Sequence, residues 1–243
     1  RSASATLLAL WPDSKDAVFA AGLALAHIDP AAARPILERA TALDPRNADP
    51  FQVLGNVIMR LGDYETSELW LWRALDRRRD AEIYNSLAIS LHHQLCFDEA
   101  ISAARSAIAQ DARNVRAWCL LGTLLFQSGD PEGSVIPSER ALELDPWNSS
   151  MHGLHGMALF DLGRLQEART HLEFAVALDP DALMSTHGSV SSPMWLHSIT
   201  RLAQVLSALG ERAAASEVVS AGLERVPNHG ALLELRAELE AGK

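Results

Sequence analysis

The feature that most constrains the fold of this chain is a short marker that recurs at a nearly constant interval. Leu144–Pro146 reads Leu-Asp-Pro, and the same tripeptide recurs at Leu178–Pro180. The related Gln110–Ala112 lies one equal step before Leu144, and Leu43–Pro45 lies nearly two further steps back. A fixed period of about 34 residues predicts an array of small supersecondary units.

The stretch 115–148 shows what one unit contains. Trp118, Leu121 and Leu125 recur at helical spacing, and a Ser-Gly-Asp-Pro turn at 128–131 separates them from a second helical stretch. The Leu-Asp-Pro marker then ends the second helix. Two short helices cannot bury their apolar faces alone, so we expect each unit to stack on its neighbours.

Six further positions keep step with the marker. The place for an aromatic residue in the first helix holds Phe51, Tyr84, Trp118 and His152. Three residues later stand Leu54, Leu87, Leu121 and His155, and the next residue is small, Gly55, Ala88, Gly122 or Gly156. The turn between the helices holds Gly62, Gly129, Gly163 and Gly210. Two positions of the second helix are small, first Ala33, Ser67, Ala100, Ser134, Ala168 and Ala215, then Ala40, Ala74, Ala107, Ala141, Ala175 and Gly222.

This pattern and its period resemble the tetratricopeptide repeat (TPR) family. The resemblance covers nearly the whole chain and implies an all-α fold, an α–α superhelix or TPR solenoid. The six repeats are 14–47, 48–80, 81–114, 115–148, 149–182 and 196–229, followed by a capping helix at 230–243. We therefore expect residues 1–243 to form a single solenoid domain.

Two segments fall outside the six repeats. Residues 1–13 match the end of a second helix, which predicts either a partial repeat of a longer protein or an N-terminal cap. Residues 183–195 form an insertion rich in Ser, which we interpret as a surface loop, with a flap over a binding groove as the alternative. Ser14 is the expected N-cap of repeat one, and Pro193 is the expected first helical residue of repeat six.

The small residues of the first helix predict a close approach between the two helices of a repeat. Gly122 and its equivalents leave room for the second helix, which turns Ala or Ser toward them. A bulky residue at such a crossing costs about 1–3 kcal/mol of stability. We therefore expect Gly122→Leu to lower the melting temperature.

Charge and composition narrow the classes of partner. The net charge of −10 argues against nucleic acid, because an acidic surface repels phosphate. The one basic cluster, Arg73 with the three arginines 77–79, is interpreted as the cationic end of a helix. No apolar run reaches the length of a membrane span. The two cysteines, Cys96 and Cys119, make neither a disulfide framework nor a zinc pattern, so cytoplasm and periplasm both remain open.

The resemblance also implies where a partner binds, because first helices of the family line a concave inner face. Carried over repeat by repeat, the inward residues are Gln52, Asn56, Met59, Glu82, Asn85, Ile89, His92, Arg116, Cys119, Thr123, Phe126, Ser150, Gly153, Met157, Phe160, His197, Thr200 and Gln204. The amides Gln52, Asn56 and Asn85 offer both a donor and an acceptor to the main chain of a peptide.

Four of these residues share one phase and predict an apolar stripe, Met59, His92, Phe126 and Phe160. For the two phenylalanines, packing between adjacent helices is an equally good interpretation. The chaperone-binding clamp of some TPR domains is incomplete here, because Gln52 stands where that clamp has a lysine.

Catalytic and metal-binding patterns are weak. His92 and His93 are adjacent and point about 100° apart on a helix, which disfavours a shared metal. His152 and His155 share a face but occupy packing positions of repeat five, so a packed or hydrogen-bonded pair is favoured over a metal pair. No zinc-protease, phosphate-loop or serine-hydrolase motif occurs.

These observations predict a non-enzymatic scaffold without a cofactor, which binds a peptide segment of a partner protein in a concave groove. An accessory domain that recruits substrate to a larger enzyme is the first alternative. A scaffold that self-associates through its ends or grooves is the second.

Overall fold

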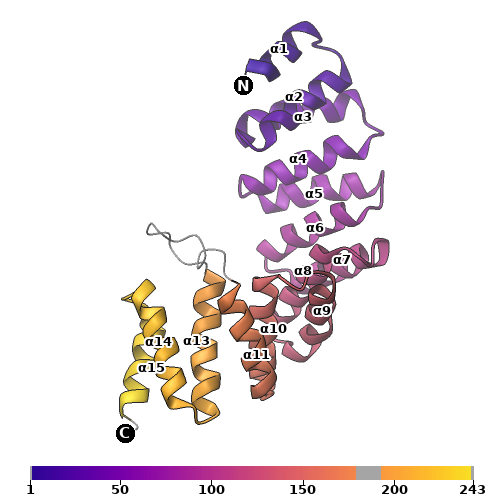
Figure 1. Cartoon of the computed structure of the whole chain (residues 1–243). Helices are drawn as coiled ribbons and strands as arrows, with labels where there is room; N and C mark the ends of the chain where they lie inside the picture. Colours follow the sequence, from indigo (N-terminus) through magenta and orange to yellow (C-terminus); the bar gives the residue numbers. More distant parts are fainter. Residues whose placement is uncertain (1, 179–192, 242–243) are drawn as a thin grey trace. The chain divides into compact units, whose positions relative to one another are not determined.

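The computed structural model describes residues 2–178 and 193–241, and within them every regular element is an α-helix (Figure 1). The helices are α1 (Ser2–Leu10), α2 (Lys15–Ala26), α3 (Pro30–Leu43), α4 (Ala48–Arg60), α5 (Tyr64–Leu75), α6 (Ala81–His93), α7 (Phe97–Gln110), α8 (Val115–Gln127), α9 (Pro131–Leu144), α10 (Ser149–Asp161), α11 (Leu165–Ala177), α13 (Pro193–Ala208), α14 (Arg212–Arg225) and α15 (Gly230–Ala241). None of these helices is long and apolar enough to cross a membrane.

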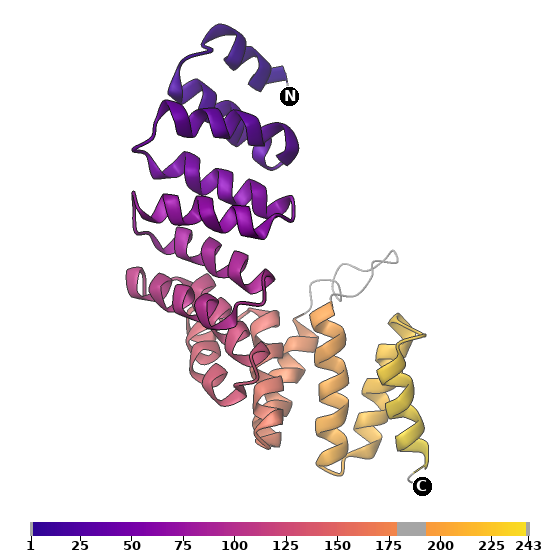
Figure 2. The ribbon, with the colours of Figure 1, turned by 180° about the vertical axis from the view of Figure 1, so that it is seen from behind.

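The chain comprises two compact units, residues 1–120 and 121–243, and the division falls inside α8. In the first unit, α2 packs on α3, α4 on α5 and α6 on α7, and each pair also contacts the next through α3–α4 and α5–α6. In the second unit, α10 packs on α11 and α13 on α14, with α11–α13 and α14–α15 joining the pairs. Figure 2 shows the same succession of helices from behind.

The helix pairs follow the sequence period. The pair α2–α3 lies in 14–47, α4–α5 in 48–80, α6–α7 in 81–114 and α10–α11 in 149–182. Helix α13 begins at Pro193, as expected, while most of the predicted 183–195 insertion lies outside the described residues. That the whole chain is one solenoid domain stays a prediction.

Helix starts are fixed by side-chain caps and by proline. The side chains of Ser14, Asp29, Asp63 and Asp130 each accept a hydrogen bond from a backbone N–H in the first turn of the helix that follows. Proline opens α3 and α9, where its missing N–H has no partner to lose. The expected cap at Ser14 is therefore confirmed, with 3.4 Å between its Oγ and the N of Ala17.

The close approach of paired helices is confirmed at three first-helix glycines. A Cβ built on Gly22 would lie 2.7 Å from Leu37, one on Gly55 2.8 Å from Leu71, and one on Gly156 2.7 Å from Leu172. In each pair a buried leucine of the second helix fills the place that the glycine leaves empty.

At Gly122 the two helices are less crowded than the sequence predicted, because an added Cβ would lie an ordinary 3.5 Å from its nearest neighbours. The reason lies in the second helix. The residue of repeat four that corresponds to Leu71 and Leu172 is Ser138, which is smaller, so the crossing keeps room for a methyl group.

The inter-helix turns require a left-handed residue. Gly62, Gly129, Gly163 and Gly210 have φ between 74° and 88°, where glycine has no Cβ penalty. The turn of repeat three uses Leu95 instead, with φ 62° and a side chain that is 72% exposed. A leucine in this region costs about 1–2 kcal/mol.

Candidate functional site

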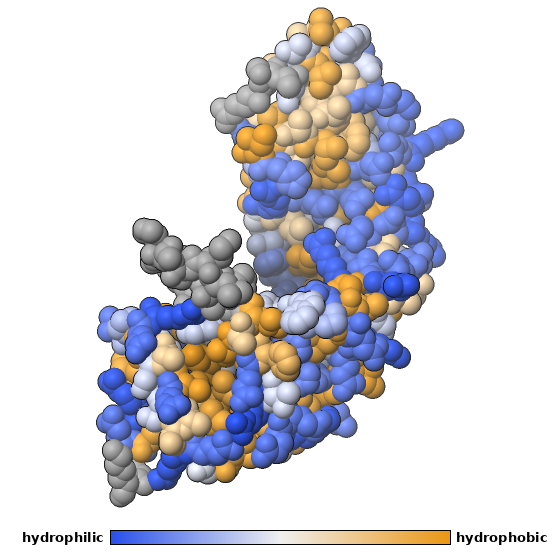
Figure 3. Space-filling view, viewed as in Figure 1, coloured by the Kyte–Doolittle hydropathy of each residue, from blue (hydrophilic) through white to orange (hydrophobic). Residues whose placement is uncertain are grey.

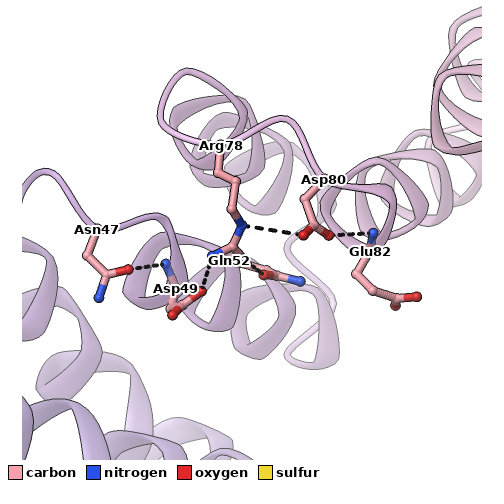
Figure 4. Close-up of polar contacts among 6 residues, drawn as sticks. All are labelled: Asn47, Asp49, Gln52, Arg78, Asp80 and Glu82. Atoms are coloured by element: carbon pink, nitrogen blue, oxygen red, sulfur yellow. Dashed lines mark hydrogen bonds and ion pairs between the residues drawn. The ribbon is translucent and has the colours of Figure 1, made fainter. Parts of the chain in front are cut away.

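In the first unit, the polar residues expected to face a ligand are partly engaged by residues from the connecting loops. The Arg78 guanidinium lies between two repeats (Figure 4). It donates from Nη1 to Asp49 Oδ1 at 2.7 Å and from Nη2 to Gln52 Oε1 at 3.3 Å, and its Nε lies 3.4 Å from Asp80 Oδ2. The acceptor of Gln52 is thus already in use within the chain.

Glu82 is engaged in the same way, one repeat further along. Its Oε1 accepts from Asn114 Nδ2 at 3.1 Å, and its Oε2 lies 3.4 Å from Arg116 Nη1. Asn114 Oδ1 accepts from Asn85 Nδ2 at 3.3 Å and from the backbone N of Ala117 at 3.0 Å, which caps α8.

These contacts tie the start of α6 to α4 and the start of α8 to α6. Asp80 caps α6 through the N–H of Glu82 at 2.8 Å and also holds Arg78, which reaches back to α4 (Figure 4). Asn114 caps α8 and reaches back to α6. Sequence reasoning assigned Arg78 only to a cationic helix end and missed its contacts with α4. It also missed Asn114, although an asparagine just before a first helix is a signal for capping.

Three of the expected residues are buried and present little or no surface to a ligand. Asn85 is fully buried on α6, and Met157 belongs to the core of the second unit. Gly153 is buried because α13 passes close by, where an added Cβ would lie 2.5 Å from Ser198 Oγ. Asn56 is half-buried, and its Oδ1 has no hydrogen-bond partner in the described part of the chain.

The aromatic members of the expected stripe are packed. Phe126 and Phe160 both lie against the core that Met157 and Leu202 share in the second unit. The ring of His92 lies 5.9 Å from that of Phe97. The other expected residues of the first helices are half-buried or exposed, namely Met59, Ile89, Cys119, Thr123 and Ser150.

The second unit brings three expected residues together in one pocket. His197, Thr200 and Gln204, all on α13, line a pocket of about 320 Å³ that is completed by Leu196, Arg201, His229 and Ala231. Over α13, hydrophobic and hydrophilic side chains lie side by side on the surface (Figure 3).

Arg201 provides the positive charge of this pocket. Its Nη1 donates to Gln204 Oε1 at 3.2 Å, and its guanidinium lies 5.1 Å from the centre of the Phe160 ring. Its contact with Asp161 is long, 3.9 Å. The Nδ1 atom of His229 is buried without a partner among the described residues. Sequence reasoning missed Arg201 and His229, because they fall outside the phase of the expected inward positions.

The histidines of repeat five form a hydrogen-bonded cluster, as the sequence favoured. His155 Nδ1 lies 2.6 Å from Ser138 Oγ, and His152 Nδ1 lies 3.0 Å from His171 Nδ1. His152 Nε2 lies 3.1 Å from the Pro146 carbonyl, which only accepts, so Nε2 carries a proton and Nδ1 accepts from His171. The part of the chain that the structure describes holds no group of three or more side chains arranged for a metal.

Burial decides how this cluster titrates. It lowers the pKa of His155 to about 4, and the neighbouring charge of His171 acts in the same direction. Burial, and then His152, also lower the pKa of His171. A buried imidazole loses hydration when it is charged, so both rings are held neutral at neutral pH.

Comparisons with known proteins agree with the helix-pair arrangement. Residues 96–149 and 149–182 match sequence patterns of the family described as Tetratricopeptide repeat. Among solved structures, YrrB, described as a TPR protein with an unusual peptide-binding site, is 18% identical with a TM-score of 0.68, over 83% of this chain and 97% of YrrB. PilF of Pseudomonas aeruginosa is 20% identical with a TM-score of 0.75, over 92% of this chain and 97% of PilF.

A curated relative is much longer than the matching region. Protein FlbA of Caulobacter vibrioides is 29% identical over 140 residues, which are 57% of this chain and 24% of FlbA. The match therefore spans about a quarter of that protein. At these identities the solved structures establish the fold alone.

Proposed function

The chain is a tetratricopeptide repeat protein with the all-α superhelix fold class of that family, and from this premise we propose that it is a protein-interaction scaffold. Its first helices bind an extended segment of a partner protein. The proposal gives the chain no catalytic step of its own.

The observation that carries the proposal is the α13 pocket of the second unit. It is concave, it lies at positions where the family pattern predicts binding, and it mixes apolar walls with a few polar groups. Small-molecule and peptide sites usually have this composition, because apolar area supplies affinity while polar groups set orientation.

The polar groups of the pocket fit an extended peptide that carries an acidic side chain. Gln204 Oε1 accepts from Arg201, which leaves the Nε2 group of Gln204 to donate to a peptide carbonyl. Thr200 Oγ1 donates to the Leu196 carbonyl at 2.7 Å, so its lone pair can accept from a peptide N–H. The guanidinium of Arg201, held only loosely by Asp161, supplies the counter-charge for a carboxylate.

Within the first unit, Asn56 is a separate candidate contact for a ligand. Its Oδ1, which has no partner among the described residues, is an acceptor that water or a ligand must satisfy, because a buried polar atom without a hydrogen bond costs free energy. Gln52 and Glu82, by contrast, are engaged by Arg78 and Asn114, so we assign them to the ties between repeats.

The likeness to YrrB supports this proposal only in its general form. YrrB is described as having a peptide-binding site, and it shares the fold with this chain. The proposed role of the α13 pocket residues is based on the contacts within this chain and not on YrrB.

Selection from a random-peptide phage library tests the proposal. The intact chain should enrich peptides that contain Asp or Glu, and Arg201→Gln and Gln204→Ala should each weaken binding of the enriched peptides about 5-fold or more. The matched control is Arg140→Gln, which removes an exposed arginine from the second helix α9.

Two results would contradict the proposal. One is a library that yields no enriched peptide with the folded chain. The other is a set of peptides that bind the two α13 variants as tightly as they bind the Arg140→Gln control.

A further inference from the structure

A second pocket lies in the first unit, on the side of the second helices. It has a volume of about 220 Å³ and opens between α5 and α7, with α6 beneath it. Its floor contains Leu87, Leu91 and Ala103, which are all buried. Its walls are formed by Glu68 and Trp72 of α5, Tyr84 of α6, and Glu99, Ser102 and Ser106 of α7.

The pocket exists because repeat three has small residues where other repeats have large ones. In repeat two, the position of Ala103 holds Trp70, whose ring lies 5.8 Å from that of Phe51. In repeat five, the positions of Ala103 and Ser106 hold His171 and Phe174, whose rings lie 5.1 Å and 5.3 Å from that of His152. In repeat three, these two positions hold only small side chains, which leave the ring of Tyr84 open to the pocket.

Two carboxylates and two aromatic rings give the open pocket its chemistry. Glu68 is fixed, because its Oε1 accepts from Trp72 Nε1 at 3.2 Å and its Oε2 accepts from Gln94 Nε2 at 3.0 Å. Glu99 lies on the exposed rim, and the Trp72 side chain is 48% exposed. Aromatic faces together with carboxylates attract a cation that also has an apolar stem.

Two other repeats show which cation suits this place. In repeat two, the guanidinium of Arg77 lies 3.7 Å from the centre of the Phe51 ring, and Phe51 is the equivalent of Tyr84. In repeat six, Arg225, at the same repeat position as Arg77, lies 4.6 Å from the centre of the Trp195 ring. Repeat three has Gln110 at that position, so that position supplies no guanidinium.

We propose that the pocket between α5 and α7 binds an arginine side chain of a partner protein. The guanidinium lies against Tyr84 and Trp72 and faces the carboxylates of Glu68 and Glu99, and the methylene stem packs on Leu87 and Leu91. The pocket volume of about 220 Å³ is large enough to hold an arginine side chain. The net charge of −10 favours approach of a basic segment.

The indole N–H of Trp72 provides a direct readout. We would titrate the chain, labelled with ¹⁵N at tryptophan, with acetyl-Gly-Arg-Gly-amide, and assign the Trp72 signal by its absence in Trp72→Phe. The expected result is a saturable shift of that signal. The matched citrulline peptide, which has the same shape without the charge, should bind at least about 5-fold more weakly, and the lysine peptide about 3-fold more weakly.

Two variants place the binding in this pocket. Ala103→Trp copies repeat two and fills the space, so the shift should disappear. Glu99→Gln changes only the exposed rim, and it should weaken binding about 3-fold while the fold is kept. Glu65→Gln is the control, because it makes the same charge change on α5 at an exposed residue outside the pocket.

The proposal fails if the Trp72 signal does not move, or if the citrulline or lysine peptide binds as tightly as the arginine peptide. It also fails if Glu99→Gln binds like Glu65→Gln. None of these results depends on the α13 pocket, so failure of the arginine-binding proposal leaves the proposal for the α13 pocket unaffected.

Discussion

Repeats two and five share one framework and fill it with different chemistry. In both, a first-helix glycine faces a buried leucine of the second helix, Gly55 with Leu71 and Gly156 with Leu172. Around that contact, repeat two packs Phe51 and Leu54, whereas repeat five has histidine at both places. The close contact between glycine and leucine therefore determines how the two helices pack. The side chains beside that contact can be polar instead of apolar, provided that they form hydrogen bonds.

The largest expected effect concerns the glycine–leucine contact that the two repeats share. Gly55→Leu and Gly156→Leu should each lower the free energy of unfolding by about 3 kcal/mol, because the new side chain overlaps a buried leucine. Urea denaturation of each variant measures the effect. Gly122→Ala is the control, and it should raise stability by about 0.5 kcal/mol, since a methyl group fits there.

A loss at Gly122→Ala as large as the losses at the other two sites would break the comparison. It would mean that all first-helix glycines are equally crowded, whatever residue faces them.

The second largest expected effect concerns the histidines that distinguish repeat five from repeat two. The pKa of His155 is about 4 in the folded chain, below the ordinary value of 6.5, so the unfolded state binds the proton first as the pH falls. The stability that this residue contributes is therefore complete above pH 6.5 and is lost as the pH falls toward 4, by about 3 kcal/mol.

His155→Leu introduces the residue that repeat two has at this position, and it should flatten this part of the pH profile of stability. His171 and, at the acid end, Glu167 contribute to the slope that remains, because their pKa values are also lowered. Replacement of His197, an exposed histidine of repeat six, is the control. A profile of His155→Leu that matches the wild type between pH 4 and 6.5 would show that this ring is not held neutral.

The smallest effect concerns the turn that repeats two and five also share. Both have a glycine with positive φ, Gly62 and Gly163, where repeat three has Leu95. Leu95→Gly should raise the free energy of unfolding by about 1 kcal/mol, because it removes the Cβ strain at φ 62° and loses little packing from an exposed side chain. Thermal melting would detect it, and an unchanged or lower midpoint would mean that Leu95 makes a stabilising contact.

The fold was predictable because its signal is repeated. A residue that departs from the pattern, such as His152 in an aromatic place, does not hide the repeat, because other repeats keep the pattern at that position. The Leu-Asp-Pro marker also shows where a repeat ends. The start of α13 at Pro193 and the cap at Ser14 followed from local rules that need no tertiary information.

The roles of the surface residues were predictable only in part. The position of a residue within the repeat indicates which way its side chain points, but not which other residues lie in front of it. Asn85 and Thr200 share one phase, yet the first is buried beside Asn114 and the second lines a pocket. The engagement of Gln52 depends on Arg78, a loop residue 26 positions away. The pocket between α5 and α7 was visible in the sequence only as a deviation, the small Ala103 where repeat two has Trp70.

The capping residues Asp80 and Asn114 couple neighbouring repeats of the first unit. Each caps the helix that follows it, and each also contacts, directly or through Arg78, side chains of the first helix before it. These hydrogen bonds are shared by the two helices. Loss of either residue therefore removes a cap from the helix that follows and a partner from the helix before, so damage at one of these short loops affects both neighbours.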